Sequence, residues 1–136
     1  MRIRLRGHHL FCIPVMQKWT LWGPRFWENV EKYKRIMESN PGVIIEVVRY
    51  CGDTCNYCPN NLKGKCRLYD FQENGNKIDL EILDKLGLKI GDQLSYAELK
   101  RLIKQKFETM PSICDWACGV KDTGCTEGFA KIKRDC

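Results

Sequence analysis

Clustered cysteines constrain this chain more than any other feature. Nine cysteines occur in 136 residues, and seven of them fall in two short stretches. The first stretch contains Cys51, Cys55, Cys58 and Cys66, and the second contains Cys114, Cys118 and Cys125. Cys12 stands apart near the start of the sequence, and Cys136 is the last residue. Thiolates separated by two or three residues can converge on one inorganic centre, so the spacing predicts a metal or iron–sulfur protein.

The length and composition predict one globular domain over residues 1–136. A chain of this length buries roughly two-thirds of the surface that its unfolded form exposes, so the cysteines are not needed in place of a core. No run approaches the ~20 apolar residues of a membrane span, and the basic N-terminus lacks the cleavage site of a secretory signal. We therefore expect a cytoplasmic protein without a membrane partner. In that reducing compartment clustered cysteines more often bind metal than form disulfides, and an odd number leaves one thiol unpaired.

The net charge is +6, from 23 Lys and Arg against 17 Asp and Glu. Bound anionic clusters would offset such an excess, because a cubane with four thiolates carries about two negative charges when oxidised. The basic residues are scattered and form no polybasic tract, so the sequence does not favour nucleic acid as the partner.

Local patterns predict two helices and a strand in the first two-thirds of the chain. Pro24 to Ser39 reads as a helix, with apolar residues three and four positions apart, and Asn40-Pro41-Gly42 ends it. Val43 to Tyr50 is β-branched and apolar and is the best strand candidate. Ile78 to Leu86 reads as a short amphipathic helix closed by Gly87.

Two further patterns complete the predicted fold. Ser95 and Glu98 form a capping box at the start of a helix that runs to about Phe107. Arg2, Arg4 and Arg6 alternate as in a short strand with one charged face. The predicted fold class is mainly α with one or two short strands (α+β), a small single domain with two cysteine-rich metal-binding loops.

The first cysteine group follows the predicted strand and has the spacing C-x3-C-x2-C, with Pro59 directly after Cys58. A proline also follows a ligating cysteine in ferredoxin-type runs. With Cys66, four thiolates suffice for one [4Fe–4S] cluster or one zinc ion, and zinc sites usually pair C-x2–4-C with a more distant pair. The triplet therefore favours a cubane. It also resembles the cluster motif of radical S-adenosylmethionine enzymes, but the residues after Cys58 do not alternate as the strands and helices of their partial barrel.

The second group supplies three thiolates and needs a fourth ligand. Cys12 or Cys136 fits that role; alternatively Cys12 completes the first group and leaves Cys51 as a bystander. The sequence leaves both assignments open, and with them the choice between one cluster and two.

His8 and His9, the only histidines of the chain, precede Cys12 by four and three residues. On a helix either imidazole can share a face with the thiol. Such a histidine ligates the centre, donates a hydrogen bond to sulfur or moves a proton; the alternative is a capping or hydrogen-bonded core histidine. We expect four nearby aromatic residues to form core or to cover a cluster: Trp19, Trp22, Phe26 and Trp27.

The stretch His8-His9-Leu10-Phe11-Cys12 resembles a small family of bacterial and archaeal proteins, domain-of-unknown-function family 1284. The resemblance extends through Cys55-x-x-Cys58-Pro59-Asn60, Gly64-Lys65-Cys66, Leu86-Gly-Leu88, the helix start at Ser95 to Leu99, and Ile113-Cys114 to Cys125-x-Glu-Gly128. By resemblance, the matching cysteines are Cys12, Cys55, Cys58, Cys66, Cys114 and Cys125. Cys51 and Cys136 have no counterpart, and the Cys114 to Cys118 spacing departs from the expected C-x2-C. The resemblance implies iron–sulfur binding and gives no reaction.

The sequence thus predicts a protein with one or two [4Fe–4S] clusters that transfers electrons, or serves as an accessory or cluster carrier for a redox or enzyme partner protein. We expect Cys55, Cys58 and Cys66 as ligands first, then Cys114, Cys118 and Cys125, with Cys12 completing one site. One alternative is an enzyme whose cluster keeps an open iron for a small ligand, with His8 or His9 as acid or base. Another is a zinc-stabilised module that binds nucleic acid. No acid–base pair or nucleophile triad stands out, so no substrate is predicted.

Overall fold

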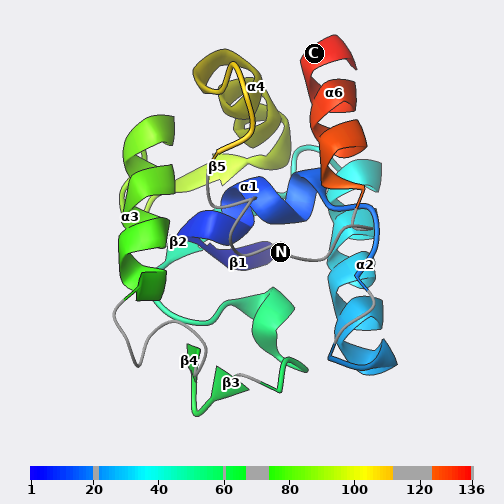
Figure 1. Cartoon of the computed structure of the whole chain (residues 1–136), viewed down its shortest axis with the longest axis vertical. Coiled ribbons are helices and arrows are strands. Elements are labelled where there is room, and N and C mark those ends of the chain that lie inside the picture. Colours follow the sequence, from blue (N-terminus) through cyan, green and yellow to red (C-terminus); the bar gives the residue numbers. More distant parts are fainter. Residues whose placement is uncertain (20–21, 60, 67–73, 112–123, 136) are drawn as a thin grey trace.

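The computed structural model describes residues 1–19, 22–59, 61–66, 74–111 and 124–135, with the backbone alone at positions 62, 65, 66, 74–76 and 135. Its elements are β1 (Arg2–Arg6), α1 (Gly7–Val15), α2 (Pro24–Ser39), β2 (Ile44–Val48), the 3-10 turn η1 (Asp53–Cys55), β3 (Asn61–Leu62), β4 (Lys65–Cys66), α3 (Asn74–Leu86), β5 (Gln93–Ser95), α4 (Tyr96–Lys106) and α6 (Cys125–Asp135) (Figure 1). The predicted class, mainly α with short strands, is confirmed. None of the described helices has the length and apolar character that crossing a membrane requires.

A three-stranded sheet of order β1-β2-β5 forms the base of the fold. β1 runs parallel to β2, with Arg2 opposite Ile44 and Arg6 opposite Val48, and β5 is antiparallel to β2. A parallel pair needs a crossover, and here α1 and α2 supply it. The strands therefore hold the start of α1 next to the chain that follows β2.

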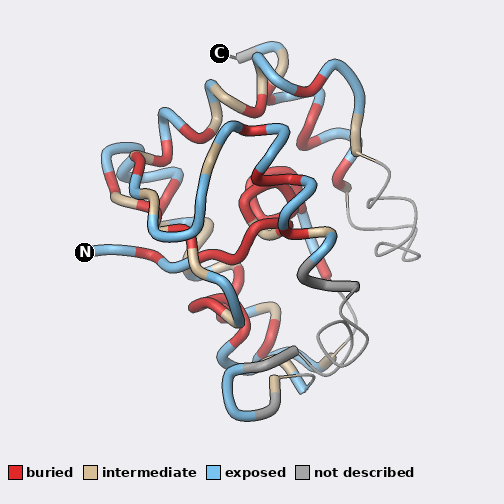
Figure 2. Tube along the Cα trace, turned by 90° about the vertical axis from the view of Figure 1, so that its left-hand side faces the viewer, coloured by how far each residue is buried: buried red, intermediate tan, exposed pale blue. Residues whose placement is uncertain are grey.

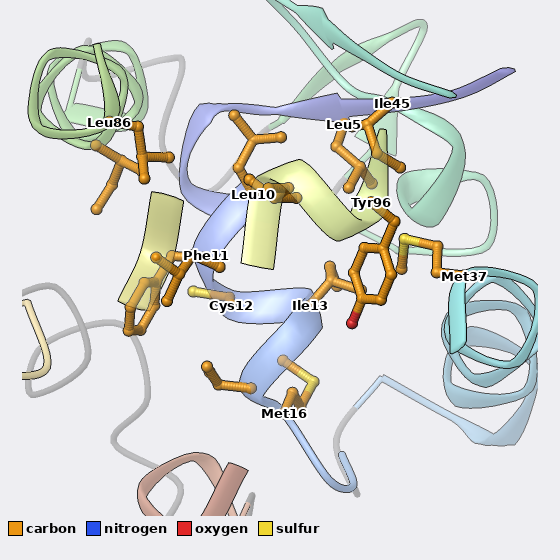
Figure 3. Close-up of a cluster of buried hydrophobic side chains, with 14 of the residues drawn as sticks. Leu5, Leu10, Phe11, Cys12, Ile13, Met16, Met37, Ile45, Leu86 and Tyr96 are labelled. Atoms are coloured by element: carbon orange, nitrogen blue, oxygen red, sulfur yellow. The ribbon is translucent and has the colours of Figure 1, made fainter. Parts of the chain in front are cut away.

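Helix α1 lies in the middle of the molecule, with α3 on one side and α2 and α6 on the other (Figure 1). Every residue of α1 except His9 is buried, and the buried stretches of the trace gather in the interior (Figure 2). Figure 3 shows its apolar side chains among residues of the surrounding elements. These labelled residues include Leu10, Phe11 and Ile13 of α1, Met37 of α2, Leu86 of α3 and Tyr96 of α4.

Both ends of α1 are capped by side chains of other helices. At the N-terminus, the backbone N–H of His8 donates to Asp79 Oδ1 of α3 at 2.8 Å. At the C-terminus, Lys34 Nζ of α2 donates to the carbonyl oxygens of Ile13 at 2.7 Å and Pro14 at 3.3 Å. A carboxylate at the N-terminus and an ammonium at the C-terminus complement the helix dipole and satisfy groups that have no partner within the helix. The central helix thus depends on α2 and α3 for its ends.

Several predicted boundaries match the structure. Helix α2 spans the predicted residues, and Ser95 Oγ accepts a hydrogen bond from the backbone N–H of Glu98 at 3.1 Å, as the capping box requires. Two other boundaries differ from the prediction. Strand β2 is shorter than the predicted Val43 to Tyr50, and α3 begins before Ile78.

The prediction of a β1 strand with one charged face is wrong at its last residue. Arg2 and Arg4 are exposed, but the Arg6 side chain is only 1% exposed, because the chain turns into α1 at this point and Asp79 of α3 pairs with the guanidinium. Helix α6 was not predicted at all; the sequence around Cys125 reads as part of a cysteine-rich loop.

Candidate functional site

A pocket of about 60 Å³ lies between α1, the start of α2 and the loop that carries the first cysteine group. One water needs only about 10–15 Å³, so the pocket has room for several waters. Its walls come from the end of β1, from α1 and the segment after it, from α2, and from residues 51–61: Arg6, His8, His9, Cys12, Ile13, Met16, Trp19, Trp22, Phe26, Cys51, Thr54, Cys55, Cys58 and Asn61.

Four cysteines line this pocket, and none of them is in a disulfide. Cys12 comes from α1, and Cys51, Cys55 and Cys58 come from the loop after β2. Cys12 and Cys55 are buried, whereas the other two are partly exposed. The fold therefore brings together the solitary N-terminal cysteine and the triplet, Cys51 included, although the family resemblance leaves Cys51 without a counterpart.

The thiols of Cys55 and Cys51 interact directly. A hydrogen bond to the Cys51 side chain, followed by burial and the nearby Cys51 charge, raises the pKa of the Cys55 thiol well above its ordinary value. Cys55 is therefore protonated in the metal-free chain at neutral pH. A thiophilic metal ion that binds here displaces that proton, since metals bind the thiolate form.

Hydrogen bonds to other elements hold the cysteine loop in place. The backbone N–H of Arg4 donates to Asp53 Oδ2 at 2.8 Å, and Arg4 Nη2 donates to Asp53 Oδ1 at 3.0 Å. Asn29 Nδ2 of α2 donates to the Asp53 carbonyl oxygen at 2.9 Å, and Asn61 Nδ2 donates to the Cys55 carbonyl oxygen at 3.0 Å. The loop is thus anchored to β1 and α2 and closed by its own far end.

His9 lies beside the thiol of Cys55. Its Nδ1 atom is 3.3 Å from Thr54 Oγ1 and 3.8 Å from Cys55 Sγ. Burial, the neighbouring His8 and the charge of Arg6 lower the pKa of His9 well below 6.5. The imidazole is therefore neutral at pH 7, and a neutral imidazole can donate a hydrogen bond to sulfur or bind a metal ion.

Behind the histidines lies a buried charge network. Arg6 Nε donates to Asp79 Oδ2 at 2.9 Å, and His8 Nδ1 lies 2.6 Å from Asp79 Oδ1. Burial by itself would raise the pKa of Asp79, but the hydrogen bond from the His8 ring and the charges of His8 and Arg6 hold it below its ordinary value. The network fixes His8 and places the permanent charge of Arg6 at the pocket wall, where it favours the thiolate form of Cys55.

Aromatic side chains form another wall of the pocket. The ring centroids of Trp19 and Trp22 lie 5.0 Å apart, and those of Trp22 and Phe26 lie 5.2 Å apart. All three residues line the pocket, whereas Trp27 packs against the core elsewhere. Among the described residues, the buried indole Nε1 of Trp19 has no hydrogen-bond partner.

These features fit a thiolate-ligated cluster. Four thiols and a neutral imidazole form a donor set that soft metal centres prefer, and the Trp19 N–H is a free donor at the same pocket. No three His, Cys, Asp or Glu side chains in the described ranges are grouped to hold one metal ion.

Two members of the second predicted group, Cys114 and Cys118, lie outside the described residues, and so does Cys136. Cys125 is described and buried at the start of α6, and it does not line the pocket. Cys66 is described by its backbone alone, in β4. The assignments of these residues as ligands stay predictions.

Sequence reasoning missed the residues that position the site. Asp79 and Asn61 have no local signal, because their roles depend on contacts with His8 and with the Cys55 carbonyl oxygen. Arg6 was assigned to an exposed face by its alternation with Arg2 and Arg4. Its place two residues before His8 is a sequence signal that could have related it to the site.

Comparison with known proteins gives one match. The family model described as "Protein of unknown function (DUF1284)" matches residues 22–124. The matched residues include the Cys51 to Cys66 stretch and begin after the His8 to Cys12 motif. No curated protein and no solved structure matches the chain.

Proposed function

The chain belongs to the DUF1284 family of proteins of unknown function, and we propose that it is an iron–sulfur protein whose pocket holds a [4Fe–4S] cluster. The observation that carries this proposal is the meeting of four thiols from two distant segments at one pocket. Cys12, Cys51, Cys55 and Cys58 would be its ligands. Further ligands for a second cluster are a separate proposal that involves Cys66, Cys114, Cys118 and Cys125.

The surroundings of the thiols support an anionic centre. Arg6 contributes a buried positive charge at the pocket wall, and a cluster with four thiolates is negative. The neutral ring of His9 adds a hydrogen-bonding group at Cys55, and such contacts orient ligands and tune a centre. The aromatic wall limits access of water, which affects both the stability and the potential of a cluster.

We assign the bound cluster to electron transfer or to service of a partner enzyme in the cytoplasm. A cluster bound by four thiolates has no open iron for a substrate, which favours a carrier. A partner protein that exchanges electrons or the cluster itself follows from that role.

The position of Cys51 favours a second candidate, an enzyme with an open iron. Cys51 is more exposed than Cys55 and shares a hydrogen bond with it. If the Cys51 thiol keeps its proton and does not bind iron, the cluster has three protein ligands, Cys12, Cys55 and Cys58. One iron is then open to a small ligand, and His9 would be the nearby acid or base. Substitution of Cys51 separates the two candidates.

The first experiment measures iron, zinc and acid-labile sulfide per chain in anaerobically purified protein. We expect about four iron and four sulfide for one cubane. Zinc without sulfide would contradict the proposal and favour a zinc-stabilised module, whose binding to nucleic acid would then be measured against salt.

Serine variants assign the ligands. Cys55→Ser is expected to lose the pocket cluster, whereas the control Cys125→Ser, at the same 6% exposure, keeps it. If both variants lost the same cluster to the same extent, the cluster would not be bound in this pocket. Cys51→Ser loses the cluster if the site has four thiolates, and keeps it with an altered electron paramagnetic resonance spectrum if one iron is open.

A further inference from the structure

The indole N–H of Trp19 is an unused donor in a buried position. Trp19 is 7% exposed and lines the cysteine pocket. Its Nε1 atom is the buried side-chain nitrogen or oxygen that lacks a hydrogen-bond partner within the described part of the chain. Tryptophan usually finds a partner for this group when it is buried, and a buried donor left unpaired costs about 1–3 kcal/mol.

In the described part of the chain, no atom of the pocket walls accepts a hydrogen bond from Trp19 Nε1. Trp22 and Phe26, whose rings pack against Trp19, have no strong acceptor atom. The Asn61 side chain already accepts a hydrogen bond from the backbone N–H of Gly64, and Thr54 Oγ1 lies within reach of His9. An acceptor brought by a bound group would satisfy the indole.

We propose that Trp19 Nε1 donates a hydrogen bond to a sulfur atom of the cluster bound in this pocket. This inference rests on the proposed function and adds a residue that sets the cluster's reduction potential. A hydrogen bond to a cluster sulfur stabilises the more negative reduced state and raises the potential. Trp19 is therefore a positioning and tuning residue rather than a ligand.

Replacement by phenylalanine removes the N–H and retains an aromatic ring. The experiment compares the reduction potentials of anaerobically purified wild-type protein and Trp19→Phe, with iron and sulfide counted in each. We expect full cluster content and a lower potential in Trp19→Phe. The expected size is an about tenfold smaller equilibrium constant for reduction, which is 59 mV for one electron. The matched control, Trp27→Phe, lies outside the pocket walls and is expected to keep the wild-type potential.

The outcomes separate this inference from the proposed function. A Trp19→Phe protein that contains the cluster and has the wild-type reduction potential would overturn the inference. In that case the indole N–H would donate to water or to no group. The proposal of a bound cluster would be unaffected. Wild-type protein without iron and sulfide would instead overturn the proposed function.

A measurement on the native side chain covers the case in which Trp19→Phe fails to fold. Nitrogen-15 labelled indole signals of the wild-type protein are recorded with the cluster and after its removal. We expect one indole N–H to exchange slowly with solvent and to show a paramagnetic shift only in the loaded protein. Identical exchange and no shift for every indole signal would overturn the inference.

Discussion

Asp79 is the residue whose contacts reach farthest into the site. Its carboxylate accepts from the guanidinium of Arg6, from the ring of His8 and from the His8 backbone N–H. The same side chain therefore caps α1, forms an ion pair with the buried Arg6 and fixes one histidine of the pocket wall. Removal of one partner of a buried pair leaves the other charge uncompensated and is costly.

We expect Asp79→Asn to lower the free energy of unfolding by about 3–5 kcal/mol at neutral pH. The folded pKa of Asp79 lies below its unfolded value of about 3.9. Its contribution is therefore present above that unfolded pKa and is lost as the pH falls through the folded pKa. Urea unfolding between pH 7 and pH 3 measures the difference in the free energy of unfolding between wild type and variant. This difference should become smaller at the acid end.

Asp84→Asn serves as the control for that series, because Asp84 is exposed on the same helix. It is expected to leave the free energy of unfolding within about 0.5 kcal/mol of wild type. A gap for Asp79→Asn that is the same at every pH would show that the carboxylate's charge is not what stabilises the fold.

For single residues, the sequence identified the candidate ligands but not the side chains that hold them in place. Cys12, the triplet and both histidines stand out because thiols and imidazoles carry the chemistry and occur at short spacings. Asp79 lies 71 residues from His8, so no local pattern relates them. Long-range pairing of this kind depends on tertiary packing, which a single sequence does not display.

Among the elements, the cysteine loop has a backbone position with no room for a side chain. A Cβ atom at Gly52 would overlap the Arg4 carbonyl oxygen, because the loop crosses β1 directly. A Cβ at Gly42 would meet its nearest atom, Asn40 Oδ1, at an ordinary 3.6 Å. The two glycines thus differ in whether a side chain fits.

We expect Gly52→Ala to move the loop away from β1, since overpacking of a backbone contact costs about 1–3 kcal/mol. The displaced cysteines would hold less iron per chain than in wild type, whereas Gly42→Ala should match wild type. Iron content and urea unfolding of both variants test this expectation. Full iron content and unchanged stability in Gly52→Ala would mean that the loop does not need its contact with β1.

Elements with local signals were predicted well, and those set by context were not. Pro24 and the Ser95 capping box mark the starts of α2 and α4 because their effects are confined to one helical turn. The start of α3 and the existence of α6 were missed. In α6, two features of a loop, Gly124 and Cys125, stand immediately at the helix start, and the cysteine spacing outweighed the pattern that follows it.

For the whole molecule, the pocket and the sheet are held by different interactions. The sheet is closed by backbone pairing of β1, β2 and β5 over an apolar core. The cysteine loop has a few hydrogen bonds and, on our proposal, a cluster. A bound ligand stabilises mainly the region of the structure that it orders.

We therefore expect removal of iron to loosen the loop more than the sheet. Hydrogen exchange followed by mass spectrometry on loaded and iron-depleted protein should show faster exchange in residues 51–61 and little change in residues 43–48. Equally faster exchange in both segments would mean that the cluster supports the entire fold. No change in either segment would mean that no bound metal orders the loop.

Fold class was predictable from composition and periodicity, but the architecture was not. The sequence gives no sign that β1 pairs in parallel with β2, and this pairing brings the end of β1 beside the cysteine loop. Nor does it show that α1 is buried among four other helices, α2, α3, α4 and α6, since the short helix carries two histidines and a proline.

The order of the pocket residues along the chain has a consequence for biosynthesis. Within the described part of the chain, the residues that line the pocket lie between Arg6 and Asn61, whereas Asp79, which caps α1 and fixes His8, comes later. A growing chain on the ribosome therefore displays Cys12, Cys51, Cys55 and Cys58 before it contains the carboxylate that caps α1 and fixes His8. During that interval these four thiols are available to metal donors and to oxidants while one wall of the pocket still lacks its support.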